Sequence, residues 1–320
     1  MATRRAGDRH GWHSGRVSEQ SRTAVVVVTG ANGLVGAAVC RALVARGASV
    51  RAVVRRAGTA PGLAGVEERV GELDDPALAA TAVAGADAVV TTVHPMGSDR
   101  ATQHRIGVEG TRSVARAARD AGVARLVHVS TAAVYRRGPD VGDVDESAAL
   151  VDDAAGAYAV TKRDAEAALA DVGGITRVLL RPPAILGPGP TSVWNTLRPD
   201  AMRRSVDARR ANPSGTFAWV HVTDLAAVAA DVATGRVTAS ADPDHGPVEA
   251  GCTALDVAAG PATARDYYGT VTRALGIDPV WDDDPAWTGR IRATRAHAWG
   301  WTPSVDLDQA LAEIDEGLRR

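Results

Sequence analysis

The amino-acid sequence predicts an α/β protein built on a doubly wound parallel sheet, with a smaller lobe formed mostly by the C-terminal part. Apolar, β-branched runs alternate with helical patterns between Ala24 and Leu180. The first run, Ala24–Thr29, passes directly into the glycine-rich turn Gly30–Gly36, and a helical pattern through Leu43 follows. Strand, glycine turn and helix in this order are typical of a loop that binds the phosphates of a dinucleotide.

Length, charge and cysteine content exclude several classes of protein. A chain of 320 residues fits one large domain or two closely associated ones, and a net charge of −2 argues against nucleic-acid binding by bulk electrostatics. Cys40 and Cys252 give neither a disulfide framework nor metal-ligand spacing, so we expect no metal and a reducing cytoplasm. No apolar run is long enough to span a membrane, and the polar residues 1–22 are expected to be a disordered extension.

The alternation of patterns sets the expected domain boundaries. Residues 23–181 form the expected dinucleotide-binding domain, whose strands are Ala24–Thr29, Ser49–Val54, Val66–Val70, Ala86–Val93, Arg125–Ser130 and Thr176–Leu180. A helix is expected from about Arg100 to Ala121 and another over Ala154–Ala170. Residues 218–235 read as a strand and a helix that return to this domain, whereas 182–217 and 236–320 form the smaller lobe that contacts the substrate.

Lys162 is the only lysine in the chain, because the other 35 of its 36 basic residues are arginine. It lies four residues after Tyr158, so on a helix the ammonium and the phenol share one face. A nearby cation lowers the pKa of a phenol from about 10, and such a tyrosine transfers a proton at a carbonyl or alcohol oxygen. The alternative is a surface tyrosine above a solvated lysine. The absence of lysine elsewhere favours the catalytic interpretation.

Residues at the ends of predicted strands point to a cofactor site. Arg55 and Arg56 follow the second strand, and no acidic residue lies between Ser49 and Gly65. An arginine at this position accommodates the 2′-phosphate of NADP, although two solvated loop charges are the alternative. His94 ends the fourth strand and is expected to border the cofactor. Ser130 and Thr131 end the fifth strand, at the edge where ligands bind open α/β sheets.

Two motifs resemble the extended short-chain dehydrogenase/reductases, the branch of epimerases, dehydratases and ketoreductases. They are Thr29-Gly30-x-x-Gly33-x-x-Gly36 and Tyr158-x-x-x-Lys162. Further segments similar to that family follow in order: Val129–Tyr135, Arg181–Gly189, Val220–Asp224 and Trp299–Pro303. The resemblance implies a Rossmann-type fold, Tyr158 as the acid/base, and Lys162 as its pKa-lowering partner that also holds the nicotinamide ribose. It implies that Thr131, with Ser130 next in line, binds the substrate oxygen.

The motifs and the resemblance together give a set of expected binding residues. Expected at the cofactor are Gly30, Asn32, Gly33, Leu34, Val35, Gly36, Arg55, Arg56, Glu72, Leu73, Thr92, Val93, His94, Val129, Lys162, Arg181, Pro182, Ala184 and Ile185. Expected at the substrate are Pro95, Ala132, Ala133, Tyr135, Trp194, Asn195 and Phe217.

The chain departs from the family pattern at two places. Gly107 stands where the family often has an asparagine, which puts a proton relay through that side chain in doubt. Thr131-Ala132-Ala133 stands where sugar-nucleotide dehydratases carry Thr-Asp-Glu, so the acid and base for water elimination are missing.

The expected function is the NADPH-dependent reduction of a carbonyl on a small-molecule substrate. A nucleotide-sugar epimerase that retains NAD(P) is the alternative enzyme, and a non-catalytic NADP-sensing protein is a third hypothesis. Relatives of that third kind have typically lost the tyrosine and lysine that this chain keeps. The resemblance also implies a homodimer formed through the helices around Val114 and Leu169. The net charge and the lack of a long apolar run predict no nucleic-acid and no membrane partner.

Overall fold

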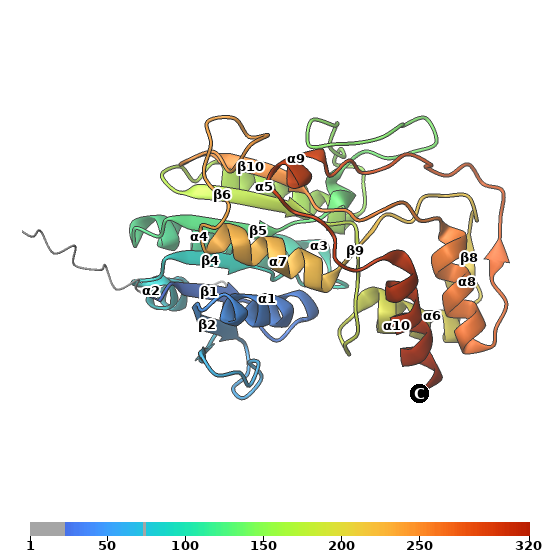
Figure 1. Cartoon of the computed structure of the whole chain (residues 1–320), viewed down its shortest axis with the longest axis horizontal. Coiled ribbons are helices and arrows are strands. Elements are labelled where there is room, and N and C mark those ends of the chain that lie inside the picture. The colour runs from blue at the N-terminus through green and yellow to red at the C-terminus, as the bar shows by residue number, and fades with distance from the viewer. Residues whose placement is uncertain (1–22, 73–74) are drawn as a thin grey trace, which may run out of the picture.

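A seven-stranded parallel sheet forms the centre of the molecule, in the order β10-β6-β5-β4-β1-β2-β3 (Figure 1). The computed structural model describes residues 23–72 and 75–320. The strands are β1 (Val25–Thr29), β2 (Ser49–Val54), β3 (Val66–Val70), β4 (Ala88–Thr91), β5 (Arg125–Val129), β6 (Thr176–Arg181) and β10 (Cys252–Asp256). All neighbouring strands run parallel, so their carboxyl ends meet along one edge of the sheet.

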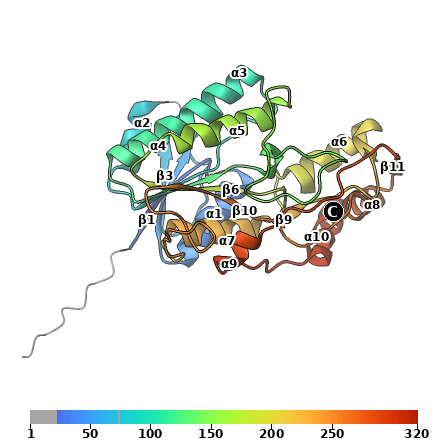
Figure 2. The same cartoon turned by 90° about the horizontal axis from the view of Figure 1, so that it is seen from above.

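Helices cover both faces of the sheet because its strands are apolar on both sides. On β1, Val26 and Val28 face one hydrophobic core while Val27 faces the other. The first core is closed by α1 (Leu34–Ala45) and α7 (Val222–Ala233), and the second by α2 (Pro76–Val83), α4 (Thr111–Asp120) and α5 (Ala157–Ala170). Figure 2 shows the two helical layers on opposite sides of the sheet. The predicted fold class is therefore confirmed.

The helix expected from Arg100 to Ala121 is continuous but not uniform. It begins as α3 (Arg100–Gln103), widens into a π-helical turn, η1 (His104–Gly110), and continues as α4. Two glycines, Gly107 and Gly110, fall within the π-helical turn, where the regular helical pattern is weakest. The turn places Ile106 at the site described below.

The smaller lobe packs around an aromatic cluster. Phe217 stacks on Tyr267 with ring centroids 4.5 Å apart, and Trp194 meets both rings edge to face. Its helical elements are η3 (Val193–Leu197), α6 (Arg198–Arg204), η4 (Asp207–Arg209), α8 (Ala264–Leu275) and α10 (Leu307–Arg319). Two short parallel strand pairs complete this part of the chain: β7 (Ala184–Leu186) pairs with β9 (Trp219–His221), which leads into α7, and β8 (Arg210–Ala211) pairs with β11 (Val280–Trp281) within the smaller lobe.

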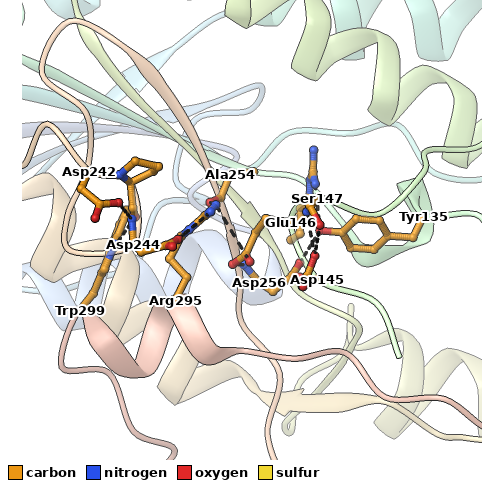
Figure 3. Close-up of polar contacts among 12 residues, drawn as sticks. Tyr135, Asp145, Glu146, Ser147, Asp242, Asp244, Ala254, Asp256, Arg295 and Trp299 are labelled. Carbon is orange, nitrogen blue, oxygen red and sulfur yellow. Dashed lines mark hydrogen bonds and ion pairs between the residues drawn. The ribbon is translucent and has the colours of Figure 1, made fainter. Parts of the chain in front are cut away.

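The expected lobe boundary is wrong at β10, which belongs to the central sheet. The sequence pattern places residues 236–320 in the smaller lobe, but Cys252–Asp256 pairs in parallel with β6. Polar contacts hold the other edge of this strand, away from β6 (Figure 3). The Asp256 amide donates to Glu146, and Arg295 of α9 (Thr294–Ala298) donates to the Ala254 carbonyl and pairs with Asp244. These partners are far apart in the sequence, so no local pattern predicts the strand.

Within the described residues, no helix has the length and apolar character needed to cross a membrane.

Candidate active site

The turn between β1 and α1 requires glycine at two positions. Gly30 has φ of +67°, and a side chain there would lie 2.8 Å from Thr92 Oγ1. A side chain at Gly36 would lie 2.2 Å from the Gly30 carbonyl oxygen, so the helix can begin this close to the strand only without one. Gly33 precedes α1 with extended backbone, and no side chain blocks the amides of the first helical turn. The turn therefore offers unblocked amides at a helix N-terminus, as anion binding requires.

A cavity of about 730 Å³ begins at this turn and extends along the carboxyl edge of the sheet into the smaller lobe. Many of the expected residues line it: Gly30, Asn32, Gly33, Leu34, Val35, Gly36, Arg55, Glu72, Thr92, Val93, His94, Pro95, Thr131, Ala133, Tyr158, Ala184, Ile185, Trp194 and Phe217. One elongated site thus joins the glycine turn to Tyr158.

Tyr158 faces the cavity from the first turn of α5. Burial raises the pKa of its phenol, while a hydrogen bond with the Thr131 hydroxyl acts in the opposite direction. Thr131 is held in place because its Oγ1 also accepts a hydrogen bond from the Ala133 amide at 3.1 Å and caps the short helix η2 (Ala132–Val134). The pair therefore presents a protonated phenol and a fixed hydroxyl to the cavity.

Lys162 lies one turn further along α5 and is almost completely buried. Its Nζ donates to the Val129 carbonyl oxygen at 2.7 Å, and burial lowers its pKa to about 8 against the opposing charge of Glu166. Burial dominates the pKa of Tyr158 because the enclosed site disfavours the phenolate, and the Lys162 ammonium is directed to the end of β5. The lowering of this pKa by Lys162 stays a prediction.

His94 is in direct contact with Tyr158, whereas the sequence predicts only that it borders the cofactor. The two rings meet edge to face with centroids 5.1 Å apart. The ring Nε2 lies 3.2 Å from Gln103 Oε1, while the buried Nδ1 has no hydrogen-bond partner among the described residues. A side chain at Gly107 would lie 2.8 Å from that Nδ1, so the histidine ring fills space that the missing side chain leaves. Burial, followed by the charge of Lys162, lowers the pKa of His94 to about 4.

Several expected site residues instead form a buried polar network beside the cavity. Glu166 accepts hydrogen bonds from Ser130 Oγ at 2.5 Å and from the Arg181 guanidinium, with which it forms an ion pair at 2.6 Å. Arg181 also donates to the Tyr135 hydroxyl, which donates to Asp256. Ser130, Arg181 and Tyr135 are thus occupied in joining β5, β6, α5 and β10. Their side chains do not line the cavity, contrary to the expectation for them.

Other expected residues also lie outside the lining. Asn195 is buried, and its Oδ1 accepts a hydrogen bond from the Gly187 amide. Ala132 is fully buried, and the remaining residues outside the lining are Arg56, Val129, Lys162 and Pro182. Leu73 falls outside the described residues. Residues that the sequence did not point to include Met96, Ile106, Arg137, Thr191, Val193 and Thr216, all of which line the cavity.

The site combines a glycine turn at a helix N-terminus, a cavity along the carboxyl edge of a parallel sheet, and a tyrosine with a lysine one turn later. Together these features define the class of Rossmann-type enzymes that use a dinucleotide. The model of the NAD dependent epimerase/dehydratase family matches residues 26–240. The chain belongs to this family of extended short-chain dehydrogenase/reductases.

Characterised relatives of this chain include two reductases. A ketoreductase of 4-hydroxy-2-methyl-3-oxo-4-farnesyl-3,4-dihydroquinoline-1-oxide from Stigmatella aurantiaca is 40% identical over 200 residues, which cover 60% of this chain and 56% of that protein. A 2-alkyl-3-oxoalkanoate reductase from Stenotrophomonas maltophilia is 36% identical over 170 residues, 51% of this chain and 52% of that protein. The matches thus span little more than half the length of these relatives.

Solved structures share the fold over nearly the whole chain. WbmH from Bordetella bronchiseptica, in complex with NAD+, has a TM-score of 0.73 at 20% identity and covers 93% of this chain and 99% of that one. DesIV, a dTDP-glucose 4,6-dehydratase from Streptomyces venezuelae with NAD and TYD bound, has a TM-score of 0.72 at 21% identity, covering 92% and 97%. At these identities, the likeness establishes the fold alone.

Proposed function

We propose that this protein reduces a ketone on a small organic substrate with NADPH. The observation that carries the proposal is the protonated phenol of Tyr158. It lies beside the Thr131 hydroxyl in a cavity that begins at a dinucleotide-type glycine turn. A phenol whose pKa is raised stays protonated at neutral pH, so it is suited to donate a proton to a carbonyl oxygen.

The cavity fits a nicotinamide dinucleotide on structural grounds. Unblocked amides at the N-terminus of α1 suit a pyrophosphate, and Arg55 presents a guanidinium to the same cavity just beyond β2. A guanidinium binds phosphate oxygens in a bidentate arrangement, which supports NADP over NAD. When bound, this cofactor supplies a hydride to the substrate carbon.

The roles of the protein's own groups follow from their positions. Tyr158 holds the proton that the carbonyl oxygen receives, and Thr131 orients that oxygen by hydrogen bonding. Lys162, fixed by the Val129 carbonyl, keeps a positive charge one turn from the tyrosine. Ala133 lines the cavity where a dehydratase would place a carboxylate, so water elimination is not proposed.

The names of the two relatives support reduction rather than epimerisation. Both are reductases of ketones in compounds with apolar chains, a farnesyl quinoline oxide and a 2-alkyl-3-oxoalkanoate. The epimerase alternative is favoured by the family itself, whose model includes epimerases. The two functions differ in whether NADPH is consumed.

The test follows the absorbance of NADPH with alkyl oxo acids, polycyclic ketones and nucleotide sugars as substrates. Tyr158→Phe should lower turnover by on the order of 10²–10⁴-fold with NADPH affinity close to wild type, because only the proton donor is removed. More than about a tenth of wild-type turnover in this variant would contradict the assignment. A protein that is purified with a stoichiometric cofactor, and interconverts sugars without consuming NADPH, would be an epimerase.

A further inference from the structure

Arg137 is a cavity residue that the proposed reaction does not use. It follows η2 in the loop after β5, and its guanidinium lies over the ring of Trp287 at 5.1 Å from the centroid. Its side chain lines the main cavity and also an adjoining hollow of about 430 Å³, which Trp287 lines as well. Arg137 thus stands where the two spaces meet.

The position of Arg137 is on the substrate side of the site. The Trp287 carbonyl accepts a hydrogen bond from the Thr216 amide, and Thr216 lines the cavity next to Phe217 of the smaller lobe. Arg55, the other arginine of the lining, follows β2, whereas Arg137 follows β5. Strands β5 and β2 are three spacings apart in the sheet, or about 14 Å. The two guanidinium groups therefore serve different parts of the site.

Arg137 has no acidic partner among the described residues. Its neighbour Arg136 forms an ion pair with Asp140 at 3.5 Å, and Arg163 of α5 pairs with Asp153 and Asp164. Arg137 instead lies over the indole face of Trp287, and no hydrogen bond to another described residue occupies its donors. A guanidinium presents a planar fork of donors that matches a carboxylate.

The surfaces around Arg137 differ on its two sides, because Arg136 and Asp152 line the adjoining hollow whereas the lining of the main cavity is mostly apolar. The apolar part of the main cavity lining includes Met96, Ile106, Val193, Trp194 and Phe217. Such a lining suits an aliphatic or terpenoid body and offers few partners for sugar hydroxyls. Because Arg137 forms no ion pair with a described residue, its guanidinium matches a ligand with a single negative charge.

We infer that the substrate is an amphipathic oxo acid whose carboxylate pairs with Arg137 while its apolar chain lies against the aromatic side of the smaller lobe. This inference rests on the proposed function for the ketone, but the carboxylate contact is a property of binding. The carboxylate and the ketone are recognised by separate groups, Arg137 for the first and Tyr158 with Thr131 for the second.

The experiment compares a medium-chain oxo fatty acid with its methyl ester, which keeps the ketone and the chain but loses the charge. Binding is measured by calorimetry on the protein loaded with NADP+, which cannot reduce the ketone, and turnover is measured separately by NADPH consumption. A charge-assisted contact of about 1.5–3 kcal/mol corresponds to a preference for the acid of about 10–100-fold. Arg137→Gln should reduce this preference to near one while the affinity for the ester stays within about twofold. Arg137→Lys should keep part of it.

Arg265 provides a matched control, since its guanidinium also lies over an indole, that of Trp281, at 5.2 Å but outside the cavity. Arg265→Gln should leave the preference intact. Equal binding of acid and ester, no binding of either, or an unchanged preference in Arg137→Gln would overturn the inference. Acid-selective binding that depends on Arg137, without NADPH consumption, would support it and count against the proposed ketone reduction. Tight binding of a nucleoside diphosphate in place of the acid would also overturn it.

Discussion

Arg55 and Arg56 are adjacent in the sequence, yet only Arg55 lines the cavity. Glu68 of β3 holds the loop after them by accepting hydrogen bonds from the amides of Gly58, Thr59 and Ala60. The loop is therefore fastened a few residues beyond the arginines. Because Arg55 lines the cavity and Arg56 does not, Arg56 serves as an internal control in a test of the cofactor preference.

Arg55→Asp should reverse a preference for NADPH, because a carboxylate repels the 2′-phosphate and accepts hydrogen bonds from ribose hydroxyls. Loss of one charge-assisted contact of about 1.5–3 kcal/mol shifts the ratio of kcat/KM for NADPH and NADH by about one to two decades. Arg56→Asp should shift it far less. A wild-type protein that prefers NADH, or equal effects of the two substitutions, would contradict this role for Arg55.

His94 and Gly107 are a second pair in which one residue explains the other. Gly107→Ala would place a methyl group 2.8 Å from His94 Nδ1, so the ring that packs on Tyr158 must move. We expect Gly107→Ala to lower the free energy of unfolding by about 1–3 kcal/mol, as is typical of overpacking. The displaced ring should also lower kcat, with NADPH affinity retained.

A double-variant cycle measures this coupling. Once His94→Ala has vacated the space, adding Gly107→Ala should cause little further loss, so the two effects should be clearly non-additive. Gly269→Ala in α8 is the matched control, because nothing lies within 4 Å of a side chain added there. Additive losses in the cycle would show that His94 and Gly107 act independently.

At the scale of the element, strand β10 ends in a fully buried carboxyl group, that of Asp256. Asp256 Oδ1 accepts a hydrogen bond from the Tyr135 hydroxyl at 2.8 Å, and Oδ2 has no partner among the described residues. Burial, followed by the charge of Glu146, raises the pKa of Asp256 from 3.8 to about 8 (Figure 3). The folded protein therefore keeps a proton that the unfolded chain releases.

The pH dependence of stability follows from this difference. Between pH 3.8 and about 8 the folded state binds the extra proton, so stability falls as pH rises, by up to about 1.4 kcal/mol per unit from this group. Asp256→Asn has no proton to lose, so its stability relative to wild type should increase from pH 5 to pH 8. Urea unfolding at several pH values measures this difference. A constant difference across the range would show that Asp256 is ionised in the folded protein.

At the scale of the molecule, short-range sequence patterns predicted those structural features that depend only on residues close together in the chain. The strands β1 to β6, the glycine turn and the Tyr158–Lys162 pair follow from apolar runs and fixed spacings, and the parallel order brings the strand ends to one cavity. Contacts between distant segments were not predictable in this way. Tyr135 and Asp256 are 121 residues apart, and Arg137 gains its position from Trp287. The burial that raises the pKa of Tyr158 likewise depends on the enclosed site and not on the spacing of Tyr158 and Lys162.

The late position of β10 in the sequence has a consequence for how the chain is made. During synthesis, β6 is complete about seventy residues before Cys252–Asp256 emerges to cover its outer edge. Until then the nascent sheet presents an unpaired edge of the kind that recruits other strands. The segment between β6 and β10 contributes elements of the smaller lobe. Part of the lobe is therefore synthesised before the last strand of the sheet. A chain cut between β6 and β10 would thus keep the outer edge of β6 without its partner strand.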